Sequence, residues 1–282
     1  MNNFPSPLIS VKQLSKNLDD PKVVILDASY YMPAMQRDGI AQWQQRRIGH
    51  AQHFDFDQTI CDKNSPYPHT MPSPEQFEHD VRALGINKDS QVVVYDGLGL
   101  FASPRVWWMF RSMGHQQIAV LDGGLPAWEA SNLPLQTGPV EPVVKGDFVA
   151  HYQPERFSDS ETVLIALQDD NARVLDARSE GRFAGAEAEP RAGLRGGHMP
   201  GARNLPFTNL LNDGFLKPAA ELKSQLEALA DTQQQLIFSC GSGVTACHLA
   251  LAAEVAGYKK LSVYDGSWCE WGARPELPIA TG

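Results

Sequence analysis

The chain contains the stretch Leu236-Ile237-Phe238-Ser239-Cys240-Gly241-Ser242-Gly243-Val244-Thr245-Ala246-Cys247-His248-Leu249-Ala250-Leu251, in which an apolar run ends in a cysteine. A short loop of small residues follows the cysteine, and an alanine- and leucine-rich segment follows the loop. This order predicts a buried strand, a tight loop and a helix. Gly241 and Gly243 allow the backbone torsions that close such a loop.

Cys240 is placed by this pattern at the C-terminal end of its strand, facing the first turn of the helix. Backbone N–H groups at that point have no helical partner, and the helix dipole adds partial positive charge. We expect a thiol in this position to ionise more readily than that of an ordinary cysteine. The pattern therefore predicts a nucleophile, and the alternative is a buried core cysteine.

An internal repeat covers most of the chain. The matching segments are 23–29 with 172–178, 91–96 with 235–240, and 118–124 with 261–267. The offset between the two copies stays between 143 and 149 residues. Two tandem copies of one domain explain this pattern.

Each copy alternates short apolar runs with helical segments, which predicts a mainly parallel sheet covered by helices. We therefore expect an α/β protein with an N-terminal domain over 1–138 and a C-terminal domain over 151–282. Residues 139–150, interrupted by Pro and Gly, have no apolar period and are expected to form the linker. Ligands of parallel sheets bind at the C-terminal ends of strands, which is where Cys240 stands.

Composition excludes several classes of partner. The 282-residue chain has 43% apolar residues and a net charge of -9, so it offers no basic patch for nucleic acid. No segment approaches the about 18 consecutive apolar residues of a membrane span, and the N-terminus lacks the pattern of a secretory signal. The four cysteines match neither a disulfide scaffold nor a zinc site. We expect no metal, no membrane and a reducing, cytoplasmic compartment.

The tandem repeat and a strand-end cysteine in the second copy make the chain resemble the two-domain rhodaneses, a family of sulfurtransferases. The repeated Asp-Ala, Gly-His and Asp-Gly elements are those expected of rhodanese domains. The resemblance implies that the first copy is catalytically silent, and Asp96 stands there in the position of Cys240. The uncharged loop after Cys240 resembles that of family members that use 3-mercaptopyruvate, whereas members that use thiosulfate carry basic residues there.

The resemblance implies that Cys240 takes the sulfur of 3-mercaptopyruvate as a persulfide and releases pyruvate. A thiol, a thioredoxin-like protein or cyanide would then accept the sulfur, and no cofactor is needed. Transfer from thiosulfate to cyanide is the alternative. The loop residues expected to bind the donor through backbone N–H groups and hydroxyls are Gly241, Gly243, Val244 and Thr245.

Two arginines of the irregular loop 182–201 are also implied by the resemblance. Arg182 and Arg191 would bind the carboxylate of the donor, because a guanidinium group offers a two-point fork to such a group. The alternative is a pair of solvated arginines bound to Glu187 or Glu189.

The resemblance further implies a proton relay of Ser242, His69 and Asp57. His69 and Asp57 belong to the first copy of the repeat, so both copies would contribute to the site. Asp55 is the alternative partner of His69, and an ordinary loop histidine is the alternative interpretation of His69 itself.

Two further interpretations are weaker. A phosphatase of similar fold needs an arginine at the sixth position after its cysteine, where this chain has Ala246. A non-enzymatic binding module would not need a cysteine at the strand end. Among the remaining cysteines, Cys247 is expected to pack in its helix, and a redox role stays open for Cys61 and Cys269.

Overall fold

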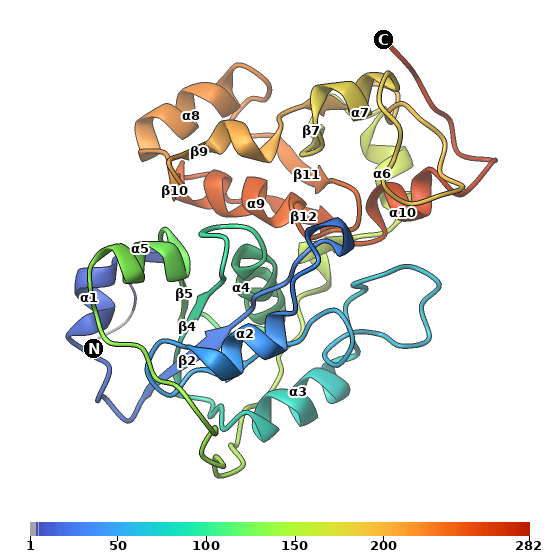
Figure 1. Ribbon diagram of the computed structural model, residues 1–282. Helices are drawn as coiled ribbons and strands as arrows, with labels where there is room; N and C mark the ends of the chain where they lie inside the picture. Colours follow the sequence, from blue (N-terminus) through green and yellow to red (C-terminus); the bar gives the residue numbers. More distant parts are fainter. Residues whose placement is uncertain (1–3, 5) are drawn as a thin grey trace. The chain divides into compact units, whose positions relative to one another are not determined.

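The computed structural model describes residue 4 and residues 6–282, and the chain forms two compact units (Figure 1). Unit 1 comprises residues up to 63 together with 71–152 and 213–216. Unit 2 comprises 64–70, 153–212 and 217–282. Each unit therefore contains one copy of the repeat and one short segment from the other half of the sequence.

Unit 1 is built on a five-stranded parallel sheet with the strand order β1-β5-β4-β2-β3. Its strands are β1 (Leu8–Ile9), β2 (Val23–Asp27), β3 (Gln52–His53), β4 (Gln91–Tyr95) and β5 (Ile118–Leu121), and β10 (Phe215–Leu216) also belongs to this unit. Its helices are α1 (Val11–Ser15), the 3-10 helix η1 (Pro33–Met35), α2 (Gly39–Gln45), α3 (Pro74–Ala83), α4 (Ser103–Ser112) and α5 (Gly124–Ala130).

Unit 2 has the same architecture, with a parallel sheet in the order β6-β12-β11-β7-β8. Its strands are β6 (Phe157–Ser158), β7 (Ala172–Asp176), β8 (Arg203–Asn204), β9 (Leu211–Asn212), β11 (Gln235–Ser239) and β12 (Leu261–Tyr264). Its helices are η2 (Pro154–Arg156), α6 (Ser160–Ala166), α7 (Glu180–Ala184), η3 (Phe207–Leu210), α8 (Ala219–Glu227), α9 (Ala246–Val255) and α10 (Ser267–Trp271). The predicted α/β fold with two copies of one parallel sheet is confirmed.

The central strands follow from short apolar runs. Every residue of β4 is buried, and so are four of the five residues of β11. Strands buried on both faces need such continuous apolar sequences, and Val and Ile suit the pleated backbone. The register pairs Val93 with Ala119 in unit 1 and Ile237 with Ser262 in unit 2, so the two sheets are assembled alike.

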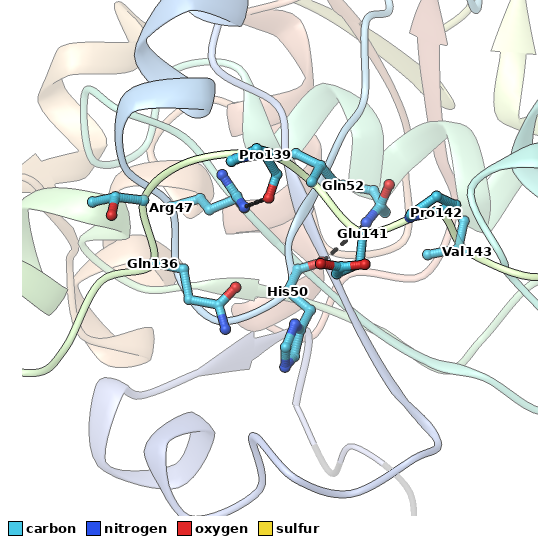
Figure 2. A pocket seen from close by; sticks show the side chains of 10 residues that line it. Arg47, His50, Gln52, Gln136, Pro139, Glu141, Pro142 and Val143 are labelled. Carbon is cyan, nitrogen blue, oxygen red and sulfur yellow. Dashed lines mark hydrogen bonds between the residues drawn. The ribbon is translucent and has the colours of Figure 1, made fainter.

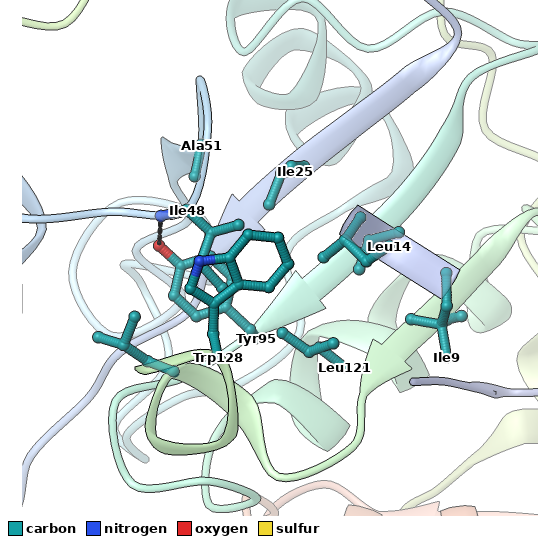
Figure 3. Packing of buried hydrophobic residues seen from close by; sticks show 11 residues of the cluster. Ile9, Leu14, Ile25, Ile48, Ala51, Tyr95, Leu121 and Trp128 are labelled. Atoms are coloured by element: carbon teal, nitrogen blue, oxygen red, sulfur yellow. Dashed lines mark hydrogen bonds between the residues drawn. The ribbon is translucent and has the colours of Figure 1, made fainter. Parts of the chain in front are cut away.

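Repeated tryptophans close the core of each unit. In unit 1, Trp128 packs in the cluster of Figure 3 and its indole N–H donates to the Pro134 carbonyl at 3.1 Å. In unit 2, Trp271 is likewise buried and donates to the Pro278 carbonyl at 2.8 Å. Burial of a Trp ring is favourable when its N–H finds such a partner. The tryptophans are thus core residues, as the sequence pattern indicated.

The loop between α7 and β8 lacks regular structure but is held by many hydrogen bonds. The Arg195 guanidinium donates to the carbonyl groups of Trp271, Gly272, Arg274 and Leu277. His198 donates its backbone N–H to Ala280, and its ring stacks on Phe183 at 3.9 Å between centroids. These bonds attach the loop to the end of α10 and to the C-terminal segment.

Gly197 tests how tightly this loop is held. Its φ is +115°, and a Cβ atom at this position would lie 2.3 Å from the Ala280 carbonyl oxygen. We predict that Gly197→Ala lowers the free energy of unfolding of unit 2 by about 3 kcal/mol, measured by urea denaturation. Gly193→Ala is the matched control, because Gly193 has a φ of +82° and no atom within 4 Å of such a Cβ. The control should lose only about 1 kcal/mol, and equal losses would refute a packed loop.

Candidate active site

Cys240 directly follows β11 and is held by the backbone of α10. Its N–H donates to Ser267 Oγ at 3.2 Å, and its carbonyl accepts from the Trp268 N–H at 2.9 Å. The Gly241 carbonyl accepts from the Cys269 N–H at 2.8 Å. Cys240 itself is 1% exposed. The predicted strand-end position is confirmed, and α10 is the element that fixes it.

The loop between Cys240 and α9 presents backbone donors. Gly243 adopts a φ of +76°, which lets the chain turn tightly before the helix begins at Ala246. In the described part of the chain, the N–H groups of Ser242, Val244 and Thr245 donate to no acceptor. Such amides at the start of a helix form a concave site for an anion.

Unit 1 shows how this kind of loop binds negative charge. The Asp96 carboxylate accepts from the Leu98 N–H at 2.9 Å through one oxygen. Its other oxygen accepts from the N–H groups of Phe101, Ala102 and Ser103 at 2.8–2.9 Å, and from Ser103 Oγ at 2.7 Å. The loop of unit 1 is therefore closed around an anion that belongs to its own chain.

The internal repeat allows the loop of unit 1 to be compared with the loop of unit 2. Alignment of Asp96 with Cys240 places Leu98, Phe101, Ala102 and Ser103 opposite Ser242, Thr245, Ala246 and Cys247. A carboxylate oxygen stands two bonds from Cβ, as does the outer sulfur of a cysteine persulfide. The loop of unit 2 is thus suited to an anion carried on Cys240, such as a thiolate or a persulfide.

A buried chain of alternating charges lies next to the loop. Arg178, with its side chain fully buried, donates to the Asp176 carboxylate at 2.6 Å and to Glu189 at 2.7 Å. The Glu189 carboxylate also accepts from Arg182, at 2.5 Å from Nη2 and 3.2 Å from Nε. Arg178 stacks on the Trp268 ring at 4.0 Å. Asp176 and Arg178 thus form a buried salt bridge at the end of β7.

Arg182, held by this network, lies beside the loop between Cys240 and α9. Its Nη2 would lie 3.0 Å from a Cβ atom placed on Gly241, so the guanidinium group stands beside the residue that follows Cys240. Arg182 forms the ion pair with Glu189 that was the alternative to donor binding in the sequence analysis. This ion pair holds the guanidinium group in place. Arg191 lies close enough to Cys269 to lower the pKa of that thiol, which burial raises.

His69 contacts Ser242 within unit 2, because residues 64–70 belong to that unit. Its Nδ1 lies 3.0 Å from Ser242 Oγ, and the histidine is 4% exposed. His69 has a φ of +63°, which is costly for a residue with a Cβ atom and is typical of functional sites. The hydroxyl–imidazole contact of the predicted relay is thus observed.

The carboxylates proposed for the relay lie in unit 1. Asp55 accepts from the N–H groups of Asp57 and Gln58 and from the Thr59 hydroxyl, which uses both of its oxygens in a local turn. The Asp57 carboxylate accepts from the Gln58 amide at 2.7 Å. Asp55 is therefore a turn residue, and the pairing of Asp57 with His69 stays a prediction.

Other features of the described residues fall outside this site. A cavity of about 580 Å³ in unit 1 is lined by Arg47, His50, Gln52 and the 136–143 segment, and no predicted site residue lines it (Figure 2). Arg47 donates there to the Gly138 and Pro139 carbonyls at 2.9 Å. Across the residues described, no three His, Cys, Asp or Glu side chains converge as metal ligands, and no helix is long and apolar enough to cross a bilayer.

The sequence patterns did not show how α10 and Glu189 support the site. Ser267 and Cys269 contact the catalytic loop from α10, and Glu189 joins two arginines. The repeat offers one signal for Ser267: unit 1 has Gly124 at this position with a φ of +53°, and Ser267 keeps a φ of +47° despite its Cβ atom. A serine in a glycine conformation indicates that its hydroxyl is needed there.

Similarities to known proteins agree with this geometry. The family described as rhodanese-like domain matches residues 10–131 and 160–274. The 3-mercaptopyruvate sulfurtransferase of Homo sapiens is 40% identical over 285 residues, 98% of this chain and 95% of that protein. The thiosulfate sulfurtransferase of Cricetulus griseus is 41% identical over 288 residues, again 98% of this chain and 95% of that protein.

A solved structure is also similar. The crystal structure of SseA from Escherichia coli, described under 3-mercaptopyruvate sulfotransferases, has a TM-score of 0.85 and 35% identity, covering 93% of this chain and 99% of that one. Relatives named for two different sulfur donors thus match about equally well. The choice of donor depends on the residues of the site.

Arg178 tests the buried charge network. We predict that Arg178→Met lowers the free energy of unfolding of unit 2 by about 3–5 kcal/mol, because two buried carboxylates lose their cation. Hydrogen exchange of β7 and β11 together with urea denaturation measures this loss. Arg203→Met, at an exposed position of β8, is the control and should change little. An unchanged stability of Arg178→Met would contradict a structural role for the network.

Proposed function

The chain belongs to the rhodanese-like family, and from this premise we propose that it transfers the sulfur of 3-mercaptopyruvate, through a persulfide on Cys240, to an acceptor and releases pyruvate. The acceptor is a thiol, a thioredoxin-like protein or cyanide. The observation that carries the proposal is the loop after Cys240, which surrounds a buried thiol with backbone donors and has no charged side chain over 241–246.

In the first step, the Cys240 thiolate attacks the sulfur of 3-mercaptopyruvate. A sulfur–sulfur bond forms, the bond between that sulfur and carbon 3 breaks, and the electron pair stays on the carbon as the enolate of pyruvate. Protonation of this carbon gives pyruvate. In the second step, an acceptor nucleophile takes the outer sulfur and Cys240 leaves as a thiolate.

The backbone amides of the loop stabilise the anion at each stage. The internal carboxylate of Asp96 supports this role, since it occupies the same loop in unit 1. By this comparison the N–H groups of Thr245 and Ala246 face the outer sulfur, with the Ser242 N–H on the opposite side of the loop. Oriented N–H groups of this kind need no reorganisation when charge develops.

Arg182 and Arg191 bind the carboxylate of the donor in this scheme. Glu189 occupies the Nε and Nη2 edge of Arg182, which leaves the Nη1 end for a second carboxylate. Glu189 also pairs with Arg178, so it holds the Arg182 guanidinium group in place beside the loop. Gly241, Gly243, Val244 and Thr245 form the remaining wall of the donor site.

The Ser242–His69 contact supplies the proton for the enolate. The hydroxyl lies two residues after the nucleophile, and the imidazole at 3.0 Å can return a proton to it. Asp57 completes the relay in this proposal by orienting the imidazole. The strained backbone of His69 supports a functional role, because a structural loop residue gains nothing from a φ of +63°.

The uncharged loop favours 3-mercaptopyruvate over thiosulfate. Thiosulfate carries two negative charges, and a loop that binds it gains from cations next to the nucleophile. Residues 241–246 offer hydroxyls and amides only. A donor with one carboxylate, held by an arginine at a distance from the sulfur, suits this arrangement better.

The domain assignment and compartment follow from the same proposal. Residues 1–138 form the silent domain, 139–150 the linker and 151–282 the catalytic domain, with 64–70 contributing His69. All four cysteines are reduced thiols in the structure, and persulfide chemistry needs reducing conditions. We place the protein in the cytoplasm.

A comparison of donors tests the assignment. We predict a higher kcat/KM with 3-mercaptopyruvate than with thiosulfate, and an increase of about 10–100-fold in the KM for 3-mercaptopyruvate in Arg182→Ala, because a charge-assisted contact is lost. Alkylation of Cys240 by a neutral reagent should persist in this variant. Arg203→Ala, an exposed arginine, serves as control. Greater efficiency with thiosulfate would overturn the donor, and an unchanged KM would remove the carboxylate-binding role.

The relay is tested through Ser242. We predict that Ser242→Ala lowers kcat with 3-mercaptopyruvate by about 10²-fold while KM changes little, because proton transfer to the enolate is impaired. His69→Asn should have a similar effect, and the double variant should add little to either. Ser224→Ala, on an exposed position of α8, is the control. Additive losses in the double variant would show that the two residues do not act together.

A further inference from the structure

A second thiol lies beside the catalytic loop. The backbone of α10 bonds to the loop twice, from the Trp268 N–H to the Cys240 carbonyl and from the Cys269 N–H to the Gly241 carbonyl. Cys240 is 1% exposed and Cys269 is 5% exposed. These bonds place Cys269 on the backbone segment that lies directly against Cys240 and Gly241, and a disulfide between the two cysteines requires Cα atoms about 4.4–6.8 Å apart.

The charges around Cys269 are those of the catalytic site. Burial raises the pKa of the Cys269 thiol to about 11, and charges on Cys240 and Glu189 act in the same direction. Arg191 and Arg182 lower the pKa of this thiol. Cys269 therefore lies within electrostatic range of Cys240, Arg182 and Arg191, and its thiol remains protonated near neutral pH.

The other two cysteines are turned elsewhere. The Cys247 thiol donates to the Gly243 carbonyl at 3.2 Å, one turn back along its own chain. The Cys61 thiol donates to the Asp57 carbonyl at 3.3 Å in unit 1. Cys269 is thus the thiol that shares the charged surroundings of Cys240.

We propose that Cys269 is a resolving thiol for the Cys240 persulfide, an inference that rests on the proposed function. The Cys269 sulfur attacks the inner sulfur of the persulfide, and the bond to the outer sulfur breaks. The outer sulfur of the anionic persulfide takes up the Cys269 proton as it leaves, so it is released as hydrosulfide. The product is a Cys240–Cys269 disulfide, which an external dithiol reduces with two electrons and two protons.

This step adds an activity to sulfur transfer. It releases sulfide without a sulfur acceptor, once for each reduction of the enzyme. Because Cys269 is protonated, its attack is slow compared with that of an external thiolate. Transfer to an acceptor therefore dominates when one is present, and Cys269 reacts when the persulfide persists.

The experiment loads the full-length protein without acceptor, with inorganic polysulfide in one arm and 3-mercaptopyruvate in the other. Sulfide release is measured, and Cys240 is followed by intact mass and peptide mapping. We expect wild type to release one sulfide per chain and to form the Cys240–Cys269 disulfide. Cys269→Ser and Cys269→Ala should keep the persulfide and release sulfide at least about tenfold more slowly. Cys61→Ser, the matched control, should behave as wild type.

The two arms separate the two proposals. A persulfide on wild type that persists as long as on Cys269→Ser would overturn the resolving role. A disulfide that joins Cys240 to Cys247 would overturn it as well. If polysulfide produces the Cys240–Cys269 disulfide while 3-mercaptopyruvate leaves Cys240 unmodified in every variant, the resolving role stands and the donor assignment fails.

Discussion

The structure of unit 2 depends on the ion pairs and hydrogen bonds of the buried Arg178 guanidinium group. This group joins the end of β7 through Asp176, the irregular loop through Glu189 and the Gly197 carbonyl, and α10 through the Trp268 ring. A charge with no solvent contact persists only where every donor finds a partner. Loop, strand end and α10 must therefore be in place together. Since α10 also holds Cys240 and Glu189 also holds Arg182, the nucleophile and the proposed donor-binding arginine are positioned by one network.

Corresponding loops in the two copies of the repeat have different surroundings for their backbone N–H groups. In unit 1 the loop is closed around Asp96, whose carboxylate accepts four backbone N–H bonds and one hydroxyl bond. In unit 2 the same position carries Cys240, and the corresponding amides of Ser242 and Thr245 donate to no acceptor among the residues described. An internal anion makes the first loop a stable structural element. A thiol leaves the second loop ready for charge that arrives during the reaction. The two strand ends thus differ in one side chain, an internal carboxylate in unit 1 and a thiol in unit 2.

Much of this arrangement is predictable from the sequence because it is local or repeated. The apolar runs ending in Asp176 and Cys240 predict strands and their polar ends, and the repeat predicts that both sheets share one strand order. Trp128 and Trp271, which occupy matching positions of the repeat, donate to the carbonyls of Pro134 and Pro278, which also match. The attachment of residues 64–70 to unit 2 is not predictable in this way, because no periodicity marks a segment that leaves its own copy. The double role of Glu189 is hidden for the same reason, since it depends on a loop without regular structure. Family resemblance, rather than pattern, pointed to His69 and Ser242.

The four cysteines of the chain differ in their surroundings. Cys61 and Cys247 each donate to a backbone carbonyl, an acceptor that favours the protonated form. Burial raises the pKa of both Cys61 and Cys269, so neither is a thiolate near neutral pH. Cys240 is buried as deeply, yet its loop provides N–H donors, and the arginine that stands beside Gly241 adds positive charge. These groups can donate hydrogen bonds to a negative charge carried on Cys240. A protein that handles reactive sulfur can therefore keep several cysteines in its core, provided that backbone amides converge at one of them.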